Sequence, residues 1–399
     1  MLYDWVRTFF IKYREVLELE SRGLVMEMLI AGDLVPTECN MDLFNIADIN
    51  ALLGKELVPL WNSADMRIFN LEVPLTNEEN PIDKCGPNLI APTSTIVGIK
   101  SLNPSLITLA NNHILDHGEQ GLRSTQNVLN KNNIPCIGAG NNLYEASEPY
   151  VIEIDGVKIG IYTCAEHEFT IATDSEPGAN PFDPLESLDH IQELKAICSY
   201  VIVLYHGGKE HYRYPSPYLQ KVSRKMVDKG ADVVICQHSH CIGCFEEYKD
   251  STIVYGQGNF IFNKHDNEYW NTGLLINIEI LEQIKVEYIP FVRTPKGIQL
   301  ASKVESEKIL SDFYERSQEI LQEGFIKIKY EQFAAKNIDN YLRKFSGFGR
   351  YISYADRKLL KGLLVKMKYN KNKLLAIRNY VECEAHRELL IEGLKNWEI

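Results

Sequence analysis

The sequence predicts an α/β fold with mostly parallel strand pairing, followed by a helical extension. Short apolar runs of strand type alternate with amphipathic helical patterns from about residue 25 to about residue 260, which is typical of strand–helix–strand units. After about residue 300 the strand patterns stop and helical periodicity continues to the end. We therefore expect a helical lead-in over 1–24, an α/β domain over 25–298 and a helical region over 299–399.

Seven apolar runs predict the strands, and each is closed by polar or glycine-rich residues. In chain order they are VMEMLIAGDL, MRIFNLEVPL, SLITLANNH, NIPCIGAG, YVIVLYHGG, DVVICQHSH and STIVYGQGNFIF. Helical patterns lie between them at 119–133, 185–199 and 216–230. Two segments break the alternation: residues 151–164, with Asp155-Gly156 at their centre, predict a tight hairpin, and residues 273–292 predict a second one.

Composition and charge narrow the class of protein. A hydrophobic content of 45% in 399 residues is ordinary for a soluble globular chain. The formal net charge of −12 argues against nucleic-acid binding. The N-terminal residues carry charges every few positions, and no stretch is long and apolar enough for a signal peptide or a membrane span, so we expect a cytoplasmic protein.

Cysteines and basic residues leave alternatives open. The nine cysteines are scattered, with a single C-x-x-C at Cys241 and Cys244, and their odd number favours a reducing compartment over a disulfide framework. Three of them, Cys236, Cys241 and Cys244, flank an H-x-H and leave a zinc knuckle as an alternative. Residues 343–378 hold eleven Lys/Arg and one Asp. Such a run indicates an anionic partner, a membrane surface or simply a solvated helical face.

Side chains of metal-ligand type follow five of the seven predicted strands. In open α/β sheets, ligands bind outside the carboxyl ends of strands. A mixed Asp, Glu, Asn and His set with almost no Lys or Arg suits a site of one or two divalent metals that activates water for hydrolysis. The strand-end residues are Asp33; Asn70 and Glu72; Asn111, Asn112, His113 and Asp116; His206 and Glu210; and His238 and His240.

Seven motifs together resemble the CapA family, which is named for poly-γ-glutamate capsule biosynthesis. In order they are GDLV, NLEVPLT, LANNHILDHGEQGL, NIPCIGAGNNLYEA, HGGKEHYRYPSP, KGADVVICQHSH and YGQGNFIF. The resemblance covers roughly residues 25–265. It implies the calcineurin-like metallophosphoesterase fold, a four-layer α/β/β/α sandwich with a metal site at the strand ends.

The resemblance also implies roles for individual residues. His113 would assist proton transfer, Asp116 and Glu210 would orient ligand histidines or meet the substrate, and Glu72 would bridge two ions. Val35 stands where phosphoesterases of this fold carry a histidine, so one metal subsite is expected to be weaker. The implied ligands of one or two Zn, Mn or Fe ions are Asp33, Glu72, Asn112, His206, His238 and His240, and the implied substrate-binding residues are Lys84, Tyr212 and Asn259. A solvated Lys84 and a turn-fixing Asn259 remain alternatives.

Three functions follow from the resemblance. The first is a metal-dependent hydrolase or transferase that acts on a poly-γ-glutamate-like or other cell-envelope polymer or precursor, using a metal-activated water. The second keeps the fold and hydrolyses phosphoesters. The third is a non-catalytic accessory subunit of capsule polymer synthesis, with the basic C-terminal helices contacting a membrane or a synthase complex.

Overall fold

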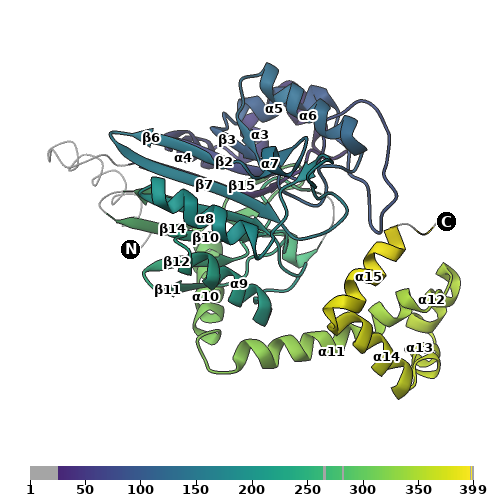
Figure 1. The fold of residues 1–399 in the computed structure, drawn as a ribbon. Coiled ribbons are helices and arrows are strands. Elements are labelled where there is room, and N and C mark those ends of the chain that lie inside the picture. The colour runs from purple at the N-terminus through teal and green to yellow at the C-terminus, as the bar shows by residue number, and fades with distance from the viewer. Residues whose placement is uncertain (1–25, 264–266, 281–282, 396, 398–399) are drawn as a thin grey trace. The chain divides into compact units, whose positions relative to one another are not determined.

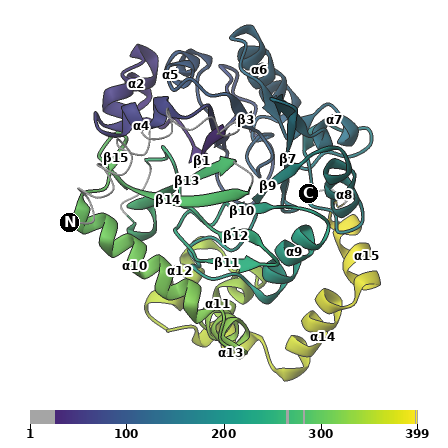
Figure 2. The same ribbon diagram turned by 90° about the vertical axis from the view of Figure 1, so that its left-hand side faces the viewer.

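The computed structural model describes residues 26–263, 267–280, 283–395 and 397. The expected lead-in over 1–24 lies outside these residues. The chain divides into two compact units after Ile326, which we describe separately. Figures 1 and 2 label the helices and strands.

Unit 1 is built on two large sheets. The first has seven strands in the order β15-β14-β13-β1-β2-β3-β4 and the second has six in the order β11-β12-β10-β9-β7-β6. Strands β5 (Ala139–Gly140) and β8 (Gly178–Ala179) form a separate pair. The bounds in the first sheet are β1 Met26–Leu34, β2 Met66–Leu71, β3 Leu106–Thr108, β4 Cys136–Ile137, β13 Thr272–Ile280, β14 Ile284–Arg293 and β15 Ile298–Leu300. Those in the second are β6 Tyr150–Ile154, β7 Val157–Ala165, β9 Tyr200–His206, β10 Val233–Gln237, β11 Phe245–Tyr248 and β12 Ser251–Tyr255.

The alternation of side chains along the strands places both sheets in the interior. In β1, Met28 and Ile30 join the core that both sheets share, whereas Leu29 joins the core under the helices of the first sheet. In β10, Val233 joins the shared core and Val234 joins the core under the helices of the second sheet. Because successive residues of a strand face opposite sides, each sheet packs against the other sheet on one face and against helices on the other. The unit is the expected four-layer α/β/β/α sandwich.

Helices cover the two outer faces of the sandwich. Those of the second sheet are amphipathic, and α9 begins at Ser216, whose side chain accepts a hydrogen bond from the Leu219 amide, with Pro217 next to it. The outer layer of the first sheet contains α2 Met41–Ile46, α3 Ile49–Leu53, α4 Leu57–Ser63, α5 Ile96–Ser101 and α6 Gly118–Lys131. On the second sheet lie α8 Glu186–Ile197 and α9 Pro217–Asp228, and α7 Leu143–Ser147 packs on β5.

Most predicted strands and both hairpins are present. Residues 151–164 form β6 and β7 around a turn at Asp155-Gly156, and 273–292 fall in the antiparallel pair β13–β14. Two predicted strands are wrong in their extent. NIPCIGAG is divided between β4 and β5, which belong to different sheets. STIVYGQGNFIF is a strand only up to Tyr255, because the chain then leaves the second sheet and runs past β1 in the first, where the Phe260 amide donates to the Asp33 carbonyl at 2.9 Å.

Helix α10 (Lys303–Glu319) belongs to the sandwich. Its Phe313 is fully buried in the core between the sheets, and the Ser317 hydroxyl accepts a hydrogen bond of 2.9 Å from the Phe245 amide. The Arg316 guanidinium donates to the Gly243 carbonyl at 2.7 Å. These contacts explain why unit 1 continues past the last strand, β15.

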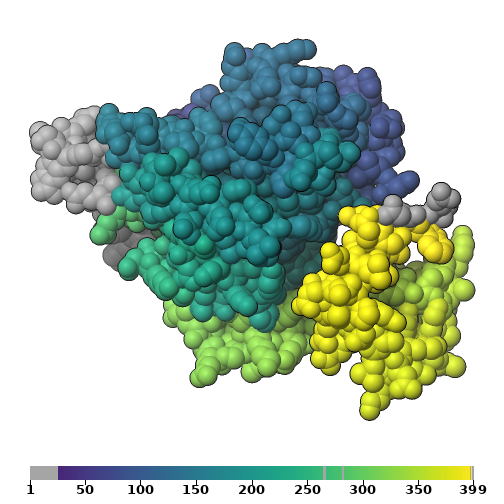
Figure 3. Space-filling model, in the orientation of Figure 1, coloured from purple at the N-terminus to yellow at the C-terminus, as the bar shows by residue number. Residues whose placement is uncertain are grey.

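Unit 2 is helical and has few buried side chains. It contains most of α11 (Phe325–Phe345), α12 (Arg350–Lys358), α13 (Leu363–Lys368), α14 (Lys371–Glu382) and α15 (Glu384–Lys395). No residue of α14 or α15 is buried, and both helices are open at the surface (yellow in Figure 3). Among the described residues, no helix combines the length and the apolar character needed to cross a membrane.

Candidate metal centre

Five of the predicted ligand residues meet where the carboxyl ends of both sheets come together. Asp33 lies near the end of β1 and Glu72 directly follows β2, which pairs parallel to β1. His206 ends β9, and His238 and His240 follow β10, which pairs parallel to β9. All five side chains are buried. The topology therefore brings two carboxylates from one sheet to three imidazoles from the other.

The donor atoms form two overlapping groups. One atom each from Asp33, Glu72 and His206 lie within 4.8 Å of one another, and so do atoms of Glu72, His238 and His240. Glu72 belongs to both groups. Asn112 adds an oxygen, since its Oδ1 lies 3.1 Å from His206 Nε2. Carboxylate oxygens, imidazole nitrogens and an amide oxygen form a donor set that divalent transition metals accept.

Glu72 provides the clearest test of whether a cation fits. Its side chain is fully buried, and neither carboxylate oxygen has a hydrogen-bond partner among the described residues. The His206 Nε2 atom lies 3.3 Å from Oε1. Burying an ionised carboxylate without compensation costs several kcal/mol or more. A cation between Glu72 and the histidines removes that cost, so the residues present fit a metal.

The electrostatics of the metal-free cluster agree with this reading. Burial lowers the pKa of His206 and His240, but the carboxylates of Asp33 and Glu72 outweigh it and raise the pKa values to about 10 and about 9. Burial raises the pKa of Asp33, but hydrogen bonds and charges of these two histidines hold it well below its ordinary value. Burial, with the charges of His206 and His240, puts the pKa of His238 far below its ordinary value. Without a metal, the cluster thus holds protons in the metal's place.

The main chain at the H-x-H motif is strained. His238 has φ 73° and His240 has φ 54°, both in the left-handed region that non-glycine residues rarely adopt. The strand ends at Gln237, so the histidines are positioned by this turn and not by strand alternation. Ser239 between them donates a hydrogen bond of 3.2 Å to the Cys241 carbonyl instead of joining the cluster. Such strain is common where a site fixes its ligands.

Three asparagines hold the ligands in place. Asn70 Nδ2 donates to Asp33 Oδ1 at 2.7 Å, and Asn259 Oδ1 accepts from His240 Nδ1 at 2.7 Å. Asn112 Nδ2 donates to Glu168 Oε2 at 3.0 Å, which turns its oxygen toward His206. The Asn259 contact fixes the orientation of the His240 ring, so it supports a candidate ligand. The sequence expectation of substrate binding by Asn259 remains a prediction.

His113 and Asp116 form a pair at the edge of the cluster. His113 Nδ1 lies 2.5 Å from Asp116 Oδ2, and Lys84 forms an ion pair with Asp116 Oδ1. The Lys84 side chain is only 3% exposed, which rules out the alternative of a solvated lysine. With Nδ1–H donating to Asp116, the other ring nitrogen of His113 remains available for proton transfer.

Two predicted residues lie apart from this arrangement. Glu210 is exposed and has no hydrogen bond to the cluster within the described part of the chain. Tyr212 is buried, and its ring meets that of Tyr214 edge-on at 6.0 Å between centroids. Their predicted roles as a catalytic and a substrate-binding residue remain predictions.

Sequence reasoning gave no role to several residues that complete the site. Asn111 Nδ2 donates to Asn70 Oδ1, and its own Oδ1 accepts from the His113 amide. Trp270 covers one side of His240, with 5.1 Å between ring centroids. The polar residue after each strand was a usable signal for Asn70 and Asn111. No sequence signal pointed to Glu168, which lies in a loop, or to Trp270, which ends a short 3-10 helix (Glu268–Trp270).

The cysteines form no alternative metal site among the described residues. All nine thiols are free, and none joins either donor group. Burial raises the pKa of Cys236 to about 12 and that of Cys241 to about 11. Since Cys236, Cys241 and Cys244 belong to no group of three or more neighbouring donor atoms in the described part of the chain, the structure does not support the zinc-knuckle alternative.

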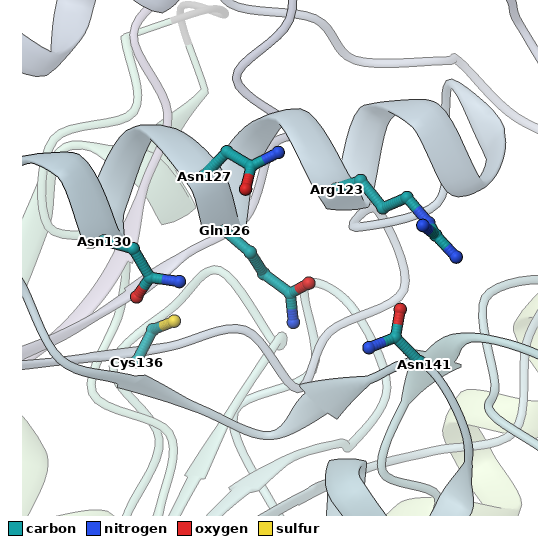
Figure 4. A pocket seen from close by; sticks show the side chains of 6 residues that line it. All are labelled: Arg123, Gln126, Asn127, Asn130, Cys136 and Asn141. Carbon is teal, nitrogen blue, oxygen red and sulfur yellow. The ribbon is translucent and has the colours of Figure 1, made fainter.

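A separate polar pocket lies between α6 and the β4–β5 segment (Figure 4). Amide side chains predominate, and its arginine already pairs with Glu119 at 2.5 Å. No residue of the metal cluster lines it, so it takes no part in the chemistry considered below. The lining residues are Arg123, Gln126, Asn127, Asn130, Cys136 and Asn141.

Comparison with known proteins identifies the family. The family model described as "Bacterial capsule synthesis protein PGA_cap" matches residues 27–264. This chain belongs to that family. The PGA_cap region contains every ligand of the candidate metal centre and ends well before unit 2. The resemblance to CapA proteins is thereby confirmed.

Curated relatives carry names from capsule synthesis. The chain is 29% identical over 254 residues to the capsule biosynthesis protein CapA of Bacillus anthracis, covering 61% of each protein. It is 30% identical over 211 residues to the PGA biosynthesis protein CapA of Bacillus subtilis, covering 52% of this chain and 55% of that one. A probable polyglutamine synthesis accessory protein of Mycobacterium tuberculosis is 25% identical, over 52% and 58% of the two chains. The chain thus spans less than two thirds of these relatives.

Solved structures are more distant. A hypothetical protein from Thermus thermophilus is 15% identical with a TM-score of 0.44, over 67% of this chain and all of that one. A phosphatase from Mycoplasma pneumoniae is 15% identical with a TM-score of 0.42, over 67% and 94%. At these scores the description of the PGA_cap fold rests on the sheets and cores of this chain.

Proposed function

We propose that the chain is a metal-dependent hydrolase or transferase of capsule polymer synthesis. Its substrate is an amide-linked polymer of the poly-γ-glutamate type, or a precursor of one. The observation that carries the proposal is the buried carboxylate of Glu72, which lacks hydrogen bonds and belongs to both donor groups. The names of the CapA relatives supply the substrate class.

A divalent cation held by the two carboxylates and three histidines would supply a Lewis acid for the amide carbonyl and lower the pKa of a water. The chain's own residues do the rest. Asp116 fixes His113 through Nδ1, so Nε2 takes a proton from the attacking water and returns it to the leaving nitrogen. Lys84 neutralises Asp116. The asparagines hold the ligands at fixed positions, which lowers the cost of reorganisation during the reaction.

The decisive experiment combines metal analysis with a substrate screen. We expect purified protein to carry metal and to cleave γ-glutamyl peptides. Glu72→Gln removes the charge with little change in volume, and we expect loss of metal and at least a roughly hundredfold loss of activity. Glu176→Gln, at an exposed position, is the matched control and should behave as wild type.

Other outcomes lead to different functions. Wild-type protein that stays metal-free in metal-replete medium, with no difference in Glu72→Gln, would contradict the proposal. Cleavage of phosphodiesters alone would make the chain a phosphoesterase. Bound metal without turnover on any substrate would favour the second candidate, a non-catalytic accessory protein, which the name of the mycobacterial relative favours.

A further inference from the structure

Charge is divided unevenly between the two units. Residues 327–399 hold sixteen Lys/Arg and eight Asp/Glu, whereas residues 1–326 hold 26 and 46. The positive charge therefore lies outside the PGA_cap region at 27–264. The net positive charge of unit 2 favours its binding to anionic partners.

The one acidic residue of the basic segment 343–378, Asp356, lies in the interior and not at the surface. Asp356 is fully buried, where its Oδ2 accepts from Arg343 Nε at 3.0 Å and its Oδ1 accepts from the Leu364 amide at 2.8 Å. The charge of Asp356 is therefore compensated inside unit 2 and does not offset the basic side chains at the surface. Five bases on or next to α12 and α13 are exposed and form no ion pair with any described residue: Arg350, Arg357, Lys358, Lys361 and Lys366.

Large apolar side chains are exposed among these bases. Tyr351 is 89% exposed, Leu359 75% and Met367 73%. At about 100° per residue, Tyr351, Tyr354 and Lys358 share the face of α12 that points away from the buried Asp356. Unit 2 therefore exposes aromatic and aliphatic side chains together with basic ones on α12, α13 and the segment between them.

This combination distinguishes between anionic partners. A soluble polyanion satisfies Lys and Arg but offers nothing to Leu359 or Met367. A bilayer surface satisfies both, because phosphate headgroups meet the bases, tyrosines prefer the interface and aliphatic side chains enter the acyl boundary. We infer that α12 and α13 dock unit 2 on a membrane surface rich in anionic phospholipid.

Vesicle co-sedimentation of the full chain tests the inference. We expect binding to phosphatidylglycerol vesicles, little binding to pure phosphatidylcholine, and release by salt. The triple variant Arg357→Gln, Lys358→Gln, Lys366→Gln should bind about a hundredfold more weakly, at about fivefold per charge. The control triple Lys55→Gln, Lys131→Gln, Lys221→Gln, at exposed positions of unit 1, should bind as wild type.

A second variant tests the apolar contribution. Leu359→Ser with Met367→Ser should weaken vesicle binding while leaving helix content by circular dichroism unchanged, because both side chains are exposed. Absence of binding to phosphatidylglycerol vesicles at low salt, or equal loss in both charge variants, would overturn the inference. So would tight binding to soluble poly-γ-glutamate without vesicle binding, or a concentration-dependent dimer that the charge variant abolishes. The metal centre is untouched by these changes, so the two proposals fail independently.

Discussion

At the scale of single residues, the orientation of His240 depends on Asn259. The Asn259 amide oxygen lies 2.7 Å from His240 Nδ1, and both residues are buried. Removing a group that orients a metal-bound histidine commonly costs 10–100-fold in metal affinity. We expect Asn259→Ala to weaken metal binding by about that factor in a competition titration with a chromogenic chelator. Unchanged affinity, equal to that of the exposed control Asn141→Ala, would show that Asn259 has no such role.

The protons held by the metal-free cluster lead to a pH dependence. With pKa values of about 10 and about 9, His206 and His240 are protonated at neutral pH. Metal ligation requires neutral imidazoles, so binding displaces these protons. We expect apparent metal affinity to rise with pH until the higher of the two pKa values is passed. Calorimetry in two buffers of different ionisation enthalpy measures the released protons, and a pH-independent affinity between about pH 6.5 and 8.5 would contradict the expectation.

The ligand types could be predicted from the sequence at this scale, but their supports could not. Asp33, Glu72 and His206 each stand at the end of an apolar run, so strand topology alone brings them together. Glu168 lies in a loop and Trp270 in the short 3-10 helix Glu268–Trp270, and both are far along the chain from their partners. Their contacts depend on loop paths that no local pattern fixes.

At the scale of elements, β1 requires a glycine where the segment after β12 crosses it. A Cβ at Gly32 would lie 2.1 Å from the Gly258 carbonyl oxygen. We expect Gly32→Ala to destabilise unit 1 by about 2–3 kcal/mol through overpacking and to displace the neighbouring Asp33. Thermal melting and metal content would both fall. Gly393→Ala is the control, since a Cβ there meets nothing within 4 Å, and in an exposed helix it should gain about 0.5–1 kcal/mol.

The elements that the sequence predicted are those with a clear pattern of apolar residues, either a continuous run or a helical period. Strands such as β9 and β10 are continuous apolar runs, and α9 has a clear amphipathic pattern with a serine cap. The division into two sheets was implied only by the family resemblance, because buried strands of both sheets have the same apolar character. Helices α2, α3 and α4 have five to seven residues, too few for a period to be recognised.

At the scale of the whole molecule, the two units differ in how much they bury. Among the described residues of 327–399 few side chains are buried, and those of Arg343 and Asp356 are two of them. Removing one partner leaves a buried charge without compensation, at a cost of about 3–5 kcal/mol. We expect Asp356→Ala to unfold unit 2 while unit 1 keeps its metal.

Calorimetry and circular dichroism measure this effect. Wild type should melt in two transitions, and Asp356→Ala should lose the smaller one together with helical signal. Glu388→Ala, exposed on α15, should keep both. A single cooperative transition shifted as a whole by Asp356→Ala would contradict independent units.

The sharing of Glu72 between the two donor groups determines how single substitutions are expected to affect metal binding. Asp33 and His206 complete one group, and His238 and His240 complete the other. If each group holds an ion, as proposed, a change at any of these four positions would damage one ion position and leave the three donors of the other group in place. A change at Glu72 would damage both positions at once. Forms that bind one ion are therefore expected among variants of these four residues, whereas a Glu72 variant is expected to bind neither ion.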